Sequence, residues 1–102
     1  MEVIKILGID LAKNIFQVHG SDEQGREVLS KKLSRKKLVE FVQRLKPCII
    51  GMEACGGAHH WGRVFGKMGH EIRLVSPQYV KPYVRGDKTD RNDAAAIAEC
   101  VS

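Results

Sequence analysis

A short apolar run that ends in a carboxylate constrains the fold of this chain more than any other stretch. Residues 3–9 are apolar except for Lys5, and Asp10 follows directly. Such a run is typical of a strand that is buried on both faces, in the middle of a sheet covered by helices. Side chains alternate along a strand, so Asp10 shares a face with Gly8, whose missing side chain leaves room for a close neighbour.

A second apolar run has the same ending. Residues 48–52 are continuously apolar, and Glu53 follows them. A helix is expected before this run, from the N-cap Ser34 to about residue 46, so the run is predicted to be parallel to the first strand. Right-handed crossovers place the two strands side by side. Asp10 and Glu53 then lie at neighbouring carboxyl ends, where open α/β sheets bind their ligands.

The remaining segments complete an α/β order. The chain has 102 residues, 43% of them apolar, which is enough for one domain with one core. A turn is expected over residues 20–25. Further strands are expected at residues 15–18, 26–33 and 71–75, and further helices around residues 61–69, 77–84 and 94–101. This order resembles that of ribonuclease-H-like domains and predicts a five-stranded mixed sheet with helices on both faces.

Two more acids stand at the start of the last helix. Asp90 and Asp93 are three residues apart, so they share a face, and they continue the apolar stripe of Ala94, Ile97 and Val101 that must lie on the sheet. Asp10, Asp90 and Asp93 each have a plain structural explanation, because acids cap loops and stabilise helix N-termini. Glu53 is less easily explained in this way, because it directly follows five apolar residues. Acids gathered from three elements repel one another unless a cation lies among them. An all-oxygen set favours Mg²⁺ or Mn²⁺ over zinc.

Three motifs resemble the N-terminal domain of the DEDD insertion-sequence transposases, a group that includes the pilin-gene invertases and resembles the resolvase RuvC. The motifs are GIDLAK at residues 8–13, MEACG at residues 52–56 and DKTDRNDA at residues 87–94. The third is the most specific, with Lys-Thr-Asp, two residues, and then Asp-Ala. The resemblance spans essentially the whole chain. It implies a catalytic, metal-binding tetrad of Asp10, Glu53, Asp90 and Asp93.

The resemblance also implies a function. Members of this family cleave and exchange DNA strands with Mg²⁺, guided by a structured RNA from the element, and we expect a full-length member to form homo-oligomers. They carry a second, C-terminal domain with a serine nucleophile, so residues 1–102 are expected to be one RuvC-like catalytic domain that is inactive alone. The serines of this chain do not match that nucleophile: Ser21, Ser30, Ser34, Ser76 and Ser102.

Basic side chains are candidates for binding nucleic acid. The formal net charge is +5, which favours an anionic partner without requiring one. Some of these side chains are close in sequence to the acids, where they can hold a phosphate or pair with Asp87 and with each other: Lys13, Lys81, Arg85, Lys88 and Arg91. A second basic cluster at residues 31–37 is interpreted as a solvated face. Trp61, Phe65, Phe16 and Phe41 fit core positions better than base-stacking ones.

Two other functions remain open at this point. The stretch at residues 8–11 also resembles the first phosphate-binding segment of actin-like ATPases and sugar kinases, although Ala12-Lys13-Asn14 follow instead of glycine and hydroxyl residues. Nucleotide binding would identify that class. Alternatively, the chain is a non-catalytic nucleic-acid-binding module, which a metal titration would distinguish.

The cysteines and the hydropathy pattern indicate the compartment. Three cysteines without zinc-like pairing predict reduced thiols rather than a disulfide framework. No apolar run approaches the length of a membrane span, and the N-terminus has no signal-peptide pattern. A cytoplasmic protein without a membrane partner is therefore expected.

Overall fold

The computed structural model describes residues 3–87 and 89–102. Within these residues five strands and four α-helices follow one another, with one 3₁₀ helix, η1. In order they are β1 (Ile6–Asp10), β2 (Ile15–Ser21), β3 (Glu27–Ser34), α1 (Arg35–Arg44), β4 (Ile49–Glu53), α2 (Ala58–Lys67), β5 (Glu71–Val75), α3 (Pro77–Val80), η1 (Lys81–Tyr83) and α4 (Asp90–Cys100).

The strands form one mixed sheet in the order β3-β2-β1-β4-β5. β1 is antiparallel to β2 and parallel to β4, and β4 is parallel to β5. Ile9 is paired with Met52, so Asp10 and Glu53 end two neighbouring parallel strands. These pairings confirm the predicted meander and the predicted position of the second apolar run beside the first.

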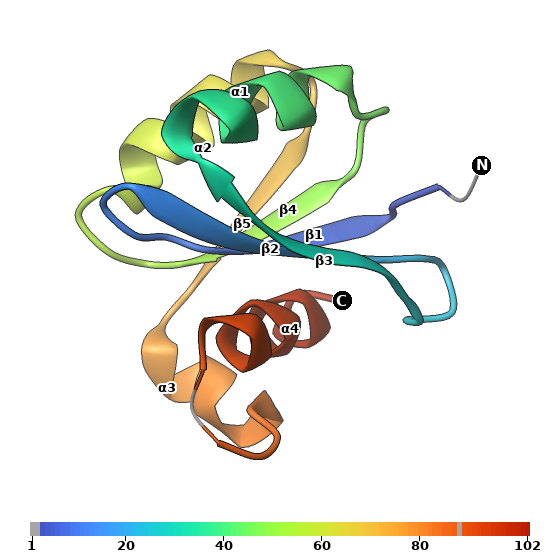
Figure 1. Cartoon of the computed structure of the whole chain (residues 1–102), viewed down its shortest axis with the longest axis vertical. Coiled ribbons are helices and arrows are strands. Elements are labelled where there is room, and N and C mark those ends of the chain that lie inside the picture. Colours follow the sequence, from blue (N-terminus) through green and yellow to red (C-terminus); the bar gives the residue numbers. More distant parts are fainter. Residues whose placement is uncertain (1–2, 88) are drawn as a thin grey trace.

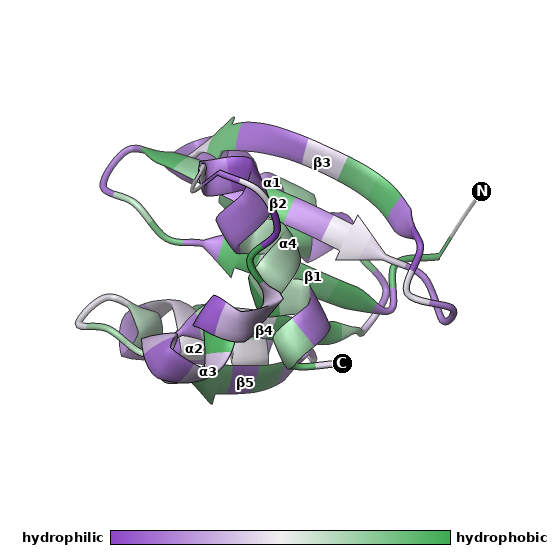
Figure 2. Ribbon diagram, turned by 90° about the horizontal axis from the view of Figure 1, so that it is seen from below, coloured by the Kyte–Doolittle hydropathy of each residue, from purple (hydrophilic) through white to green (hydrophobic). Residues whose placement is uncertain are grey.

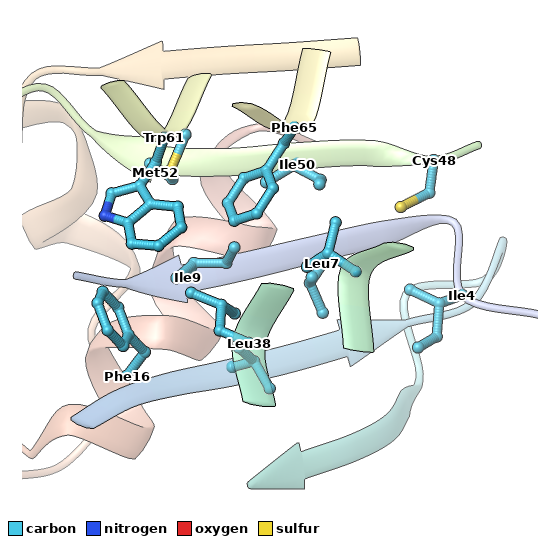
Figure 3. Packing of buried hydrophobic residues seen from close by; sticks show 12 residues of the cluster. Ile4, Leu7, Ile9, Phe16, Leu38, Cys48, Ile50, Met52, Trp61 and Phe65 are labelled. Atoms are coloured by element: carbon cyan, nitrogen blue, oxygen red, sulfur yellow. The ribbon is translucent and has the colours of Figure 1, made fainter. Parts of the chain in front are cut away.

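Helices cover both faces of the sheet, as Figure 1 shows, with α1 and α2 on one face and α3 and α4 on the other. The larger core lies under α1 and α2, where Phe65, Leu38 and Ile9 are fully buried (Figure 3). A smaller cluster under α4 joins Ile6, Ala98 and Val101. Figure 2 shows hydrophilic segments interrupting β3, which fits its position at the sheet edge.

Local residues determine where two of the helices begin and end. The Ser34 hydroxyl accepts a hydrogen bond from the backbone N–H of Lys37 (3.3 Å), which confirms the predicted N-cap of α1. Gly69, with a positive φ of 98°, turns the chain after α2, close to the predicted helix end.

The structure differs from two sequence-based expectations. β2 continues to Ser21, so Gly20 and Ser21 are paired in the sheet and not in the turn, and the register shifts at this point. The turn starts at Asp22, whose Oδ1 accepts hydrogen bonds from the backbone N–H groups of Gln24 and Arg26. The expected helix over residues 77–84 is divided into α3 and η1, because a proline at position 82 has no N–H to continue the α-helical ladder.

Two further features agree with the sequence. The three cysteines are not paired with one another. In the part of the chain that the structure describes, no helix is both long enough and apolar enough to cross a membrane.

Candidate metal centre

Two glycines allow α4 to lie directly on the sheet. A Cβ atom built at Gly8 would overlap the carbonyl oxygen of Ala94 and lie 2.7 Å from the backbone nitrogen of Ala98. A Cβ atom built at Gly51 would lie 2.6 Å from a methyl group of Val101. The backbone of α4 therefore occupies the space that a side chain on β1 would take, and side chains of Val101 and Ile97 occupy the space beside Gly51 on β4. This close packing brings the first turn of α4 to the end of β1.

Three of the four predicted acids gather at that point. One carboxylate oxygen from each of Asp10, Asp90 and Asp93 lies within 4.8 Å of the others. Asp10 and Asp93 are partly buried, whereas Asp90 is exposed. Glu53 ends the neighbouring strand, β4, but its carboxylate lies outside this close group. The structure thus brings the end of β1 and the start of α4 together as the sequence predicts, and Glu53 lies outside the group of three carboxylates.

The carboxyl group of Asp10 reports the electrostatics of the cluster. Partial burial raises the pKa of Asp10 from 3.8 to about 7, with further contributions from the charges of Asp90 and Asp93, from a hydrogen bond with Asp90 and from the charge of Glu53. Glu53 is therefore close enough to act on Asp10. A pKa this high means that the cluster favours a proton, or an added cation, at neutral pH.

The helix-cap explanation does not account for Asp90 and Asp93. Thr89 is the N-cap of α4, and its hydroxyl accepts a hydrogen bond from the backbone N–H of Asn92 (3.1 Å). The two aspartates lie in the first turn, where they also interact favourably with the helix dipole. Their carboxylates are not needed as caps, so they remain available as ligands.

The donor set fits a hard divalent cation. All donors in the described cluster are carboxylate oxygens, with no histidine or cysteine among them. Oxygen ligands favour Mg²⁺ or Mn²⁺, whereas zinc sites use nitrogen and sulfur as well. Burial and then the charges of Asp90 and Asp93 raise the pKa of Asp10, and a bound cation would offset both effects. Asp10, Asp90 and Asp93 are therefore suited to hold one such ion together.

The predicted basic residues are more dispersed than the acids. Arg91 lies 3.5 Å from Glu27, and Arg85 lies 3.1 Å from Glu99, so these two arginines pair with glutamates and not with Asp87, which was one of the two alternatives for them. Glu99 is nine residues after Asp90 and six after Asp93, which places the Arg85 pair roughly 9–13 Å along α4 from these acids. Lys81 and Lys13 are exposed. Lys88 lies outside the described residues.

Aromatic residues fill the core as predicted, and one basic residue does not behave as expected. Trp61, Phe65 and Phe16 are buried.

Arg35, which the sequence places in a solvated face, donates from Nη2 to the carbonyl oxygen of Lys13 in the loop after β1 (3.1 Å). Sequence reasoning missed this position, because it depends on how α1 meets that loop.

Comparisons with known proteins point to one family. The family model of the DEDD transposases of the IS110 type, described as "Transposase", matches residues 7–102. The chain is 52% identical over its whole length to "Transposase for insertion sequence element IS1111A" of Coxiella burnetii. It is 50% identical over 94% of its length to "Probable family 20 transposase" of Pseudomonas aeruginosa. The chain spans 28% of the length of each of these two relatives.

A solved structure confirms the predicted fold. The structure described as "T. thermophilus RuvC in complex with Holliday junction substrate" superposes with a TM-score of 0.66. The match covers 93% of this chain and 90% of the RuvC chain, at 12% sequence identity. The shared architecture is the ribonuclease-H-like sheet with helices on both faces.

Proposed function

Because the chain belongs to the DEDD transposase family of the IS110 type, we propose that it is the metal-dependent catalytic domain of a DNA transposase. The gathered carboxylates of Asp10, Asp90 and Asp93 are the observation that carries this proposal. We propose that these three residues and Glu53 hold Mg²⁺ or Mn²⁺. In this assignment Glu53 completes the set from β4, next to Asp10.

Two elements position the three gathered acids: the central strand β1 and the helix α4, which packs on the sheet. Asp10 ends the central strand, where its backbone is paired with Gln17 of β2 and the preceding residue, Ile9, is paired with Met52 of β4. Asp90 and Asp93 are carried by α4, whose position depends on the contact with Gly8. Since the pKa of Asp10 is about 7, binding of a cation near neutral pH releases a proton. A bound divalent ion supplies charge stabilisation and activation of oxygen nucleophiles at a phosphodiester.

The same assignment names partners. DNA is the proposed substrate for two reasons. A relative is named as the transposase of an insertion sequence, and a divalent ion held by the acids can act on a phosphodiester. A structured guide RNA and homo-oligomer formation by the full-length protein are part of the proposal. Strand exchange is proposed to need a serine nucleophile from outside residues 1–102, since the chain spans 28% of its relatives.

Calorimetric titration with Mg²⁺ and Mn²⁺ tests the proposal. The wild-type chain should bind the ions and release protons, whereas Asp10→Asn should lose most of the binding. Asp87→Asn is the matched control, because Asp87 is an exposed acid near α4 that lies outside the cluster. Equal titrations of all three proteins would contradict the metal site and favour a non-catalytic module. Binding of a nucleoside triphosphate through residues 8–11 would favour the ATPase class instead.

A further inference from the structure

A cleft of about 280 Å³ opens at the end of the sheet where β1 and β4 finish. Its walls come from the segments that follow β1 and β4, together with the first residue of α1 and the first half of α2. Figure 3 shows Trp61 and Phe16 at the end of the core where β1 finishes, far from Ile4 and Cys48. Leu11 lines the cleft and directly follows Asp10 in the chain. The cleft and the candidate metal centre therefore lie at the same end of β1, the cleft on the α1 and α2 side of the sheet and the acids on the α4 side.

Arg35 forms one wall and is held in place although it is exposed. Its Nη2 donates to the carbonyl oxygen of Lys13 (3.1 Å), and its guanidinium carbon lies 5.3 Å from the ring centre of Trp61. Within the described part of the chain, no carboxylate forms an ion pair with Arg35. The remaining guanidinium N–H groups can bind an anion in the cleft without first breaking an ion pair.

Trp61 forms the inner wall. The side chain is almost completely buried, with 5% of its surface exposed, and the ring of His60 packs edge-on against it (5.2 Å between centres). None of the residues 3–87 and 89–102 accepts a hydrogen bond from the indole N–H, and this nitrogen is not among their fully buried unpartnered atoms. Trp61 therefore contributes aromatic surface to the cleft.

The charge of the cleft is opposite to that of the neighbouring acids. Its described lining contains one cation, one histidine and no carboxylate: Leu11, Ala12, Arg35, Cys55, Gly57, His60 and Trp61. A guanidinium beside apolar and aromatic surface suits a ligand that is anionic at one end and planar at the other. A nucleotide unit has this chemistry, with a phosphate for the arginine and a base for the ring.

We propose that this cleft binds one nucleotide of the DNA strand whose neighbouring phosphodiester lies at Asp10. Arg35 holds the phosphate of that nucleotide, and its base or sugar lies against Trp61 and His60. The identification of the strand rests on the proposed function, because it follows from the position of the cleft and the acids at the same end of β1. Arg35 is thus a binding residue that positions the strand for the metal centre.

Trp61 provides the measurement, because it is the single tryptophan of the chain. Titration with the decamer dT10 should change its emission, and Arg35→Ala should raise the dissociation constant about fivefold or more. The salt dependence of binding should also fall, by about 0.7 in logarithmic slope for one lost phosphate contact. Lys36→Ala is the matched control, because it removes a charge from the next, exposed position outside the cleft; we expect less than a twofold change.

A second variant distinguishes the loss of a binding group from a folding defect. Arg35→Lys keeps the charge and loses the guanidinium fork, so it should bind dT10 more tightly than Arg35→Ala but more weakly than the wild type. Equal affinities of Arg35→Ala and Lys36→Ala, or an unchanged tryptophan emission at saturating dT10, would overturn the inference. Binding of rU10 but not of dT10 would overturn the assignment to DNA.

Mg²⁺ separates this inference from the proposed function. An emission change that depends on Arg35 supports the nucleotide cleft both with and without Mg²⁺. If that change persists while calorimetry detects no ion binding, the metal centre fails and the cleft stands. If ion binding is normal and Arg35→Ala behaves like Lys36→Ala, the cleft fails and the metal centre stands.

Discussion

His70 accepts a hydrogen bond at Nδ1 from the backbone N–H of Cys48 (3.2 Å). Since Nδ1 is an acceptor here, the ring proton is on Nε2, which donates to the carbonyl oxygen of Val42 (3.1 Å). The ring is buried, with 6% of its surface exposed. One neutral histidine thus joins the end of α1, the start of β4 and the start of β5, at the sheet end opposite the acids.

Replacement of His70 should therefore destabilise the domain. His70→Phe leaves the N–H of Cys48 and the carbonyl of Val42 without partners, and we expect a loss of about 2–4 kcal/mol in the free energy of unfolding. Urea denaturation measures this loss. The control is His59→Phe, an exposed position where we expect less than about 0.5 kcal/mol. Similar losses in both variants would contradict the bridging role of His70.

A methyl group at Gly8 should separate α4 from the sheet. In Gly8→Ala the new Cβ overlaps backbone atoms of α4, which cannot move aside as a flexible side chain does. We expect a loss of about 1–3 kcal/mol or more, together with weaker Mg²⁺ binding, since Asp90 and Asp93 move with the helix. Gly56→Ala is the control, because a Cβ at Gly56 meets no atom within 4 Å. Normal Mg²⁺ binding by Gly8→Ala would contradict the dependence of the site on this contact.

The gathering of Asp10 with Asp90 and Asp93 could be predicted because each position follows from a periodic pattern. An acid that follows a buried strand lies at the carboxyl end of that strand. Acids that extend an apolar helical stripe face the sheet. The apolar runs also predicted which strands are central and how they are paired. The position of Glu53 relative to the other three depends on side-chain rotation, which no sequence period determines.

The partners of the basic residues could not be predicted from the sequence for a related reason. Arg91 is the second residue of α4 and Glu27 is the first residue of β3, so their contact depends on how α4 packs against the sheet. Arg35 reaches Lys13 across 22 residues, through the way α1 meets the loop after β1. Contacts of this kind depend on loop geometry, and neither hydrophobic periodicity nor local motifs encode it.

Loss of the α4 cap should affect both stability and metal binding. Thr89→Ala removes the acceptor for the N–H of Asn92, which typically costs about 1 kcal/mol. The first turn, which carries Asp90 and Asp93, should fray, so the Mg²⁺ affinity should fall as well. Ser76→Ala is the matched control, because Ser76 precedes α3 without forming a side-chain cap. Thermal unfolding and calorimetric titration of both variants test this, and an unchanged Thr89→Ala would show that packing alone holds the turn.

The raised pKa of Asp10 predicts how stability depends on pH without metal. Burial and the facing carboxylates of Asp90, Asp93 and Glu53 raise the pKa from 3.8 to about 7 in the folded chain. Between these values the folded state holds more protons than the unfolded state, so stability falls as pH rises through this window. The contribution of Asp10 is fully present below about pH 4 and is lost above about pH 7.

Asp10→Asn should remove this dependence, because an amide of nearly the same shape does not ionise. Since water screens a half-buried carboxyl group, we expect the variant to be more stable than the wild type by about 1 kcal/mol at pH 8, and by less at pH 5. Mg²⁺ should raise the melting temperature of the wild type, most at pH 8 where the acids are ionised, and should have little effect on Asp10→Asn. Calorimetric scans of both proteins at the two pH values, with and without Mg²⁺, measure these differences. Equal melting temperatures of the two proteins under all four conditions would mean that Asp10 is an ordinary surface acid without a role in binding metal.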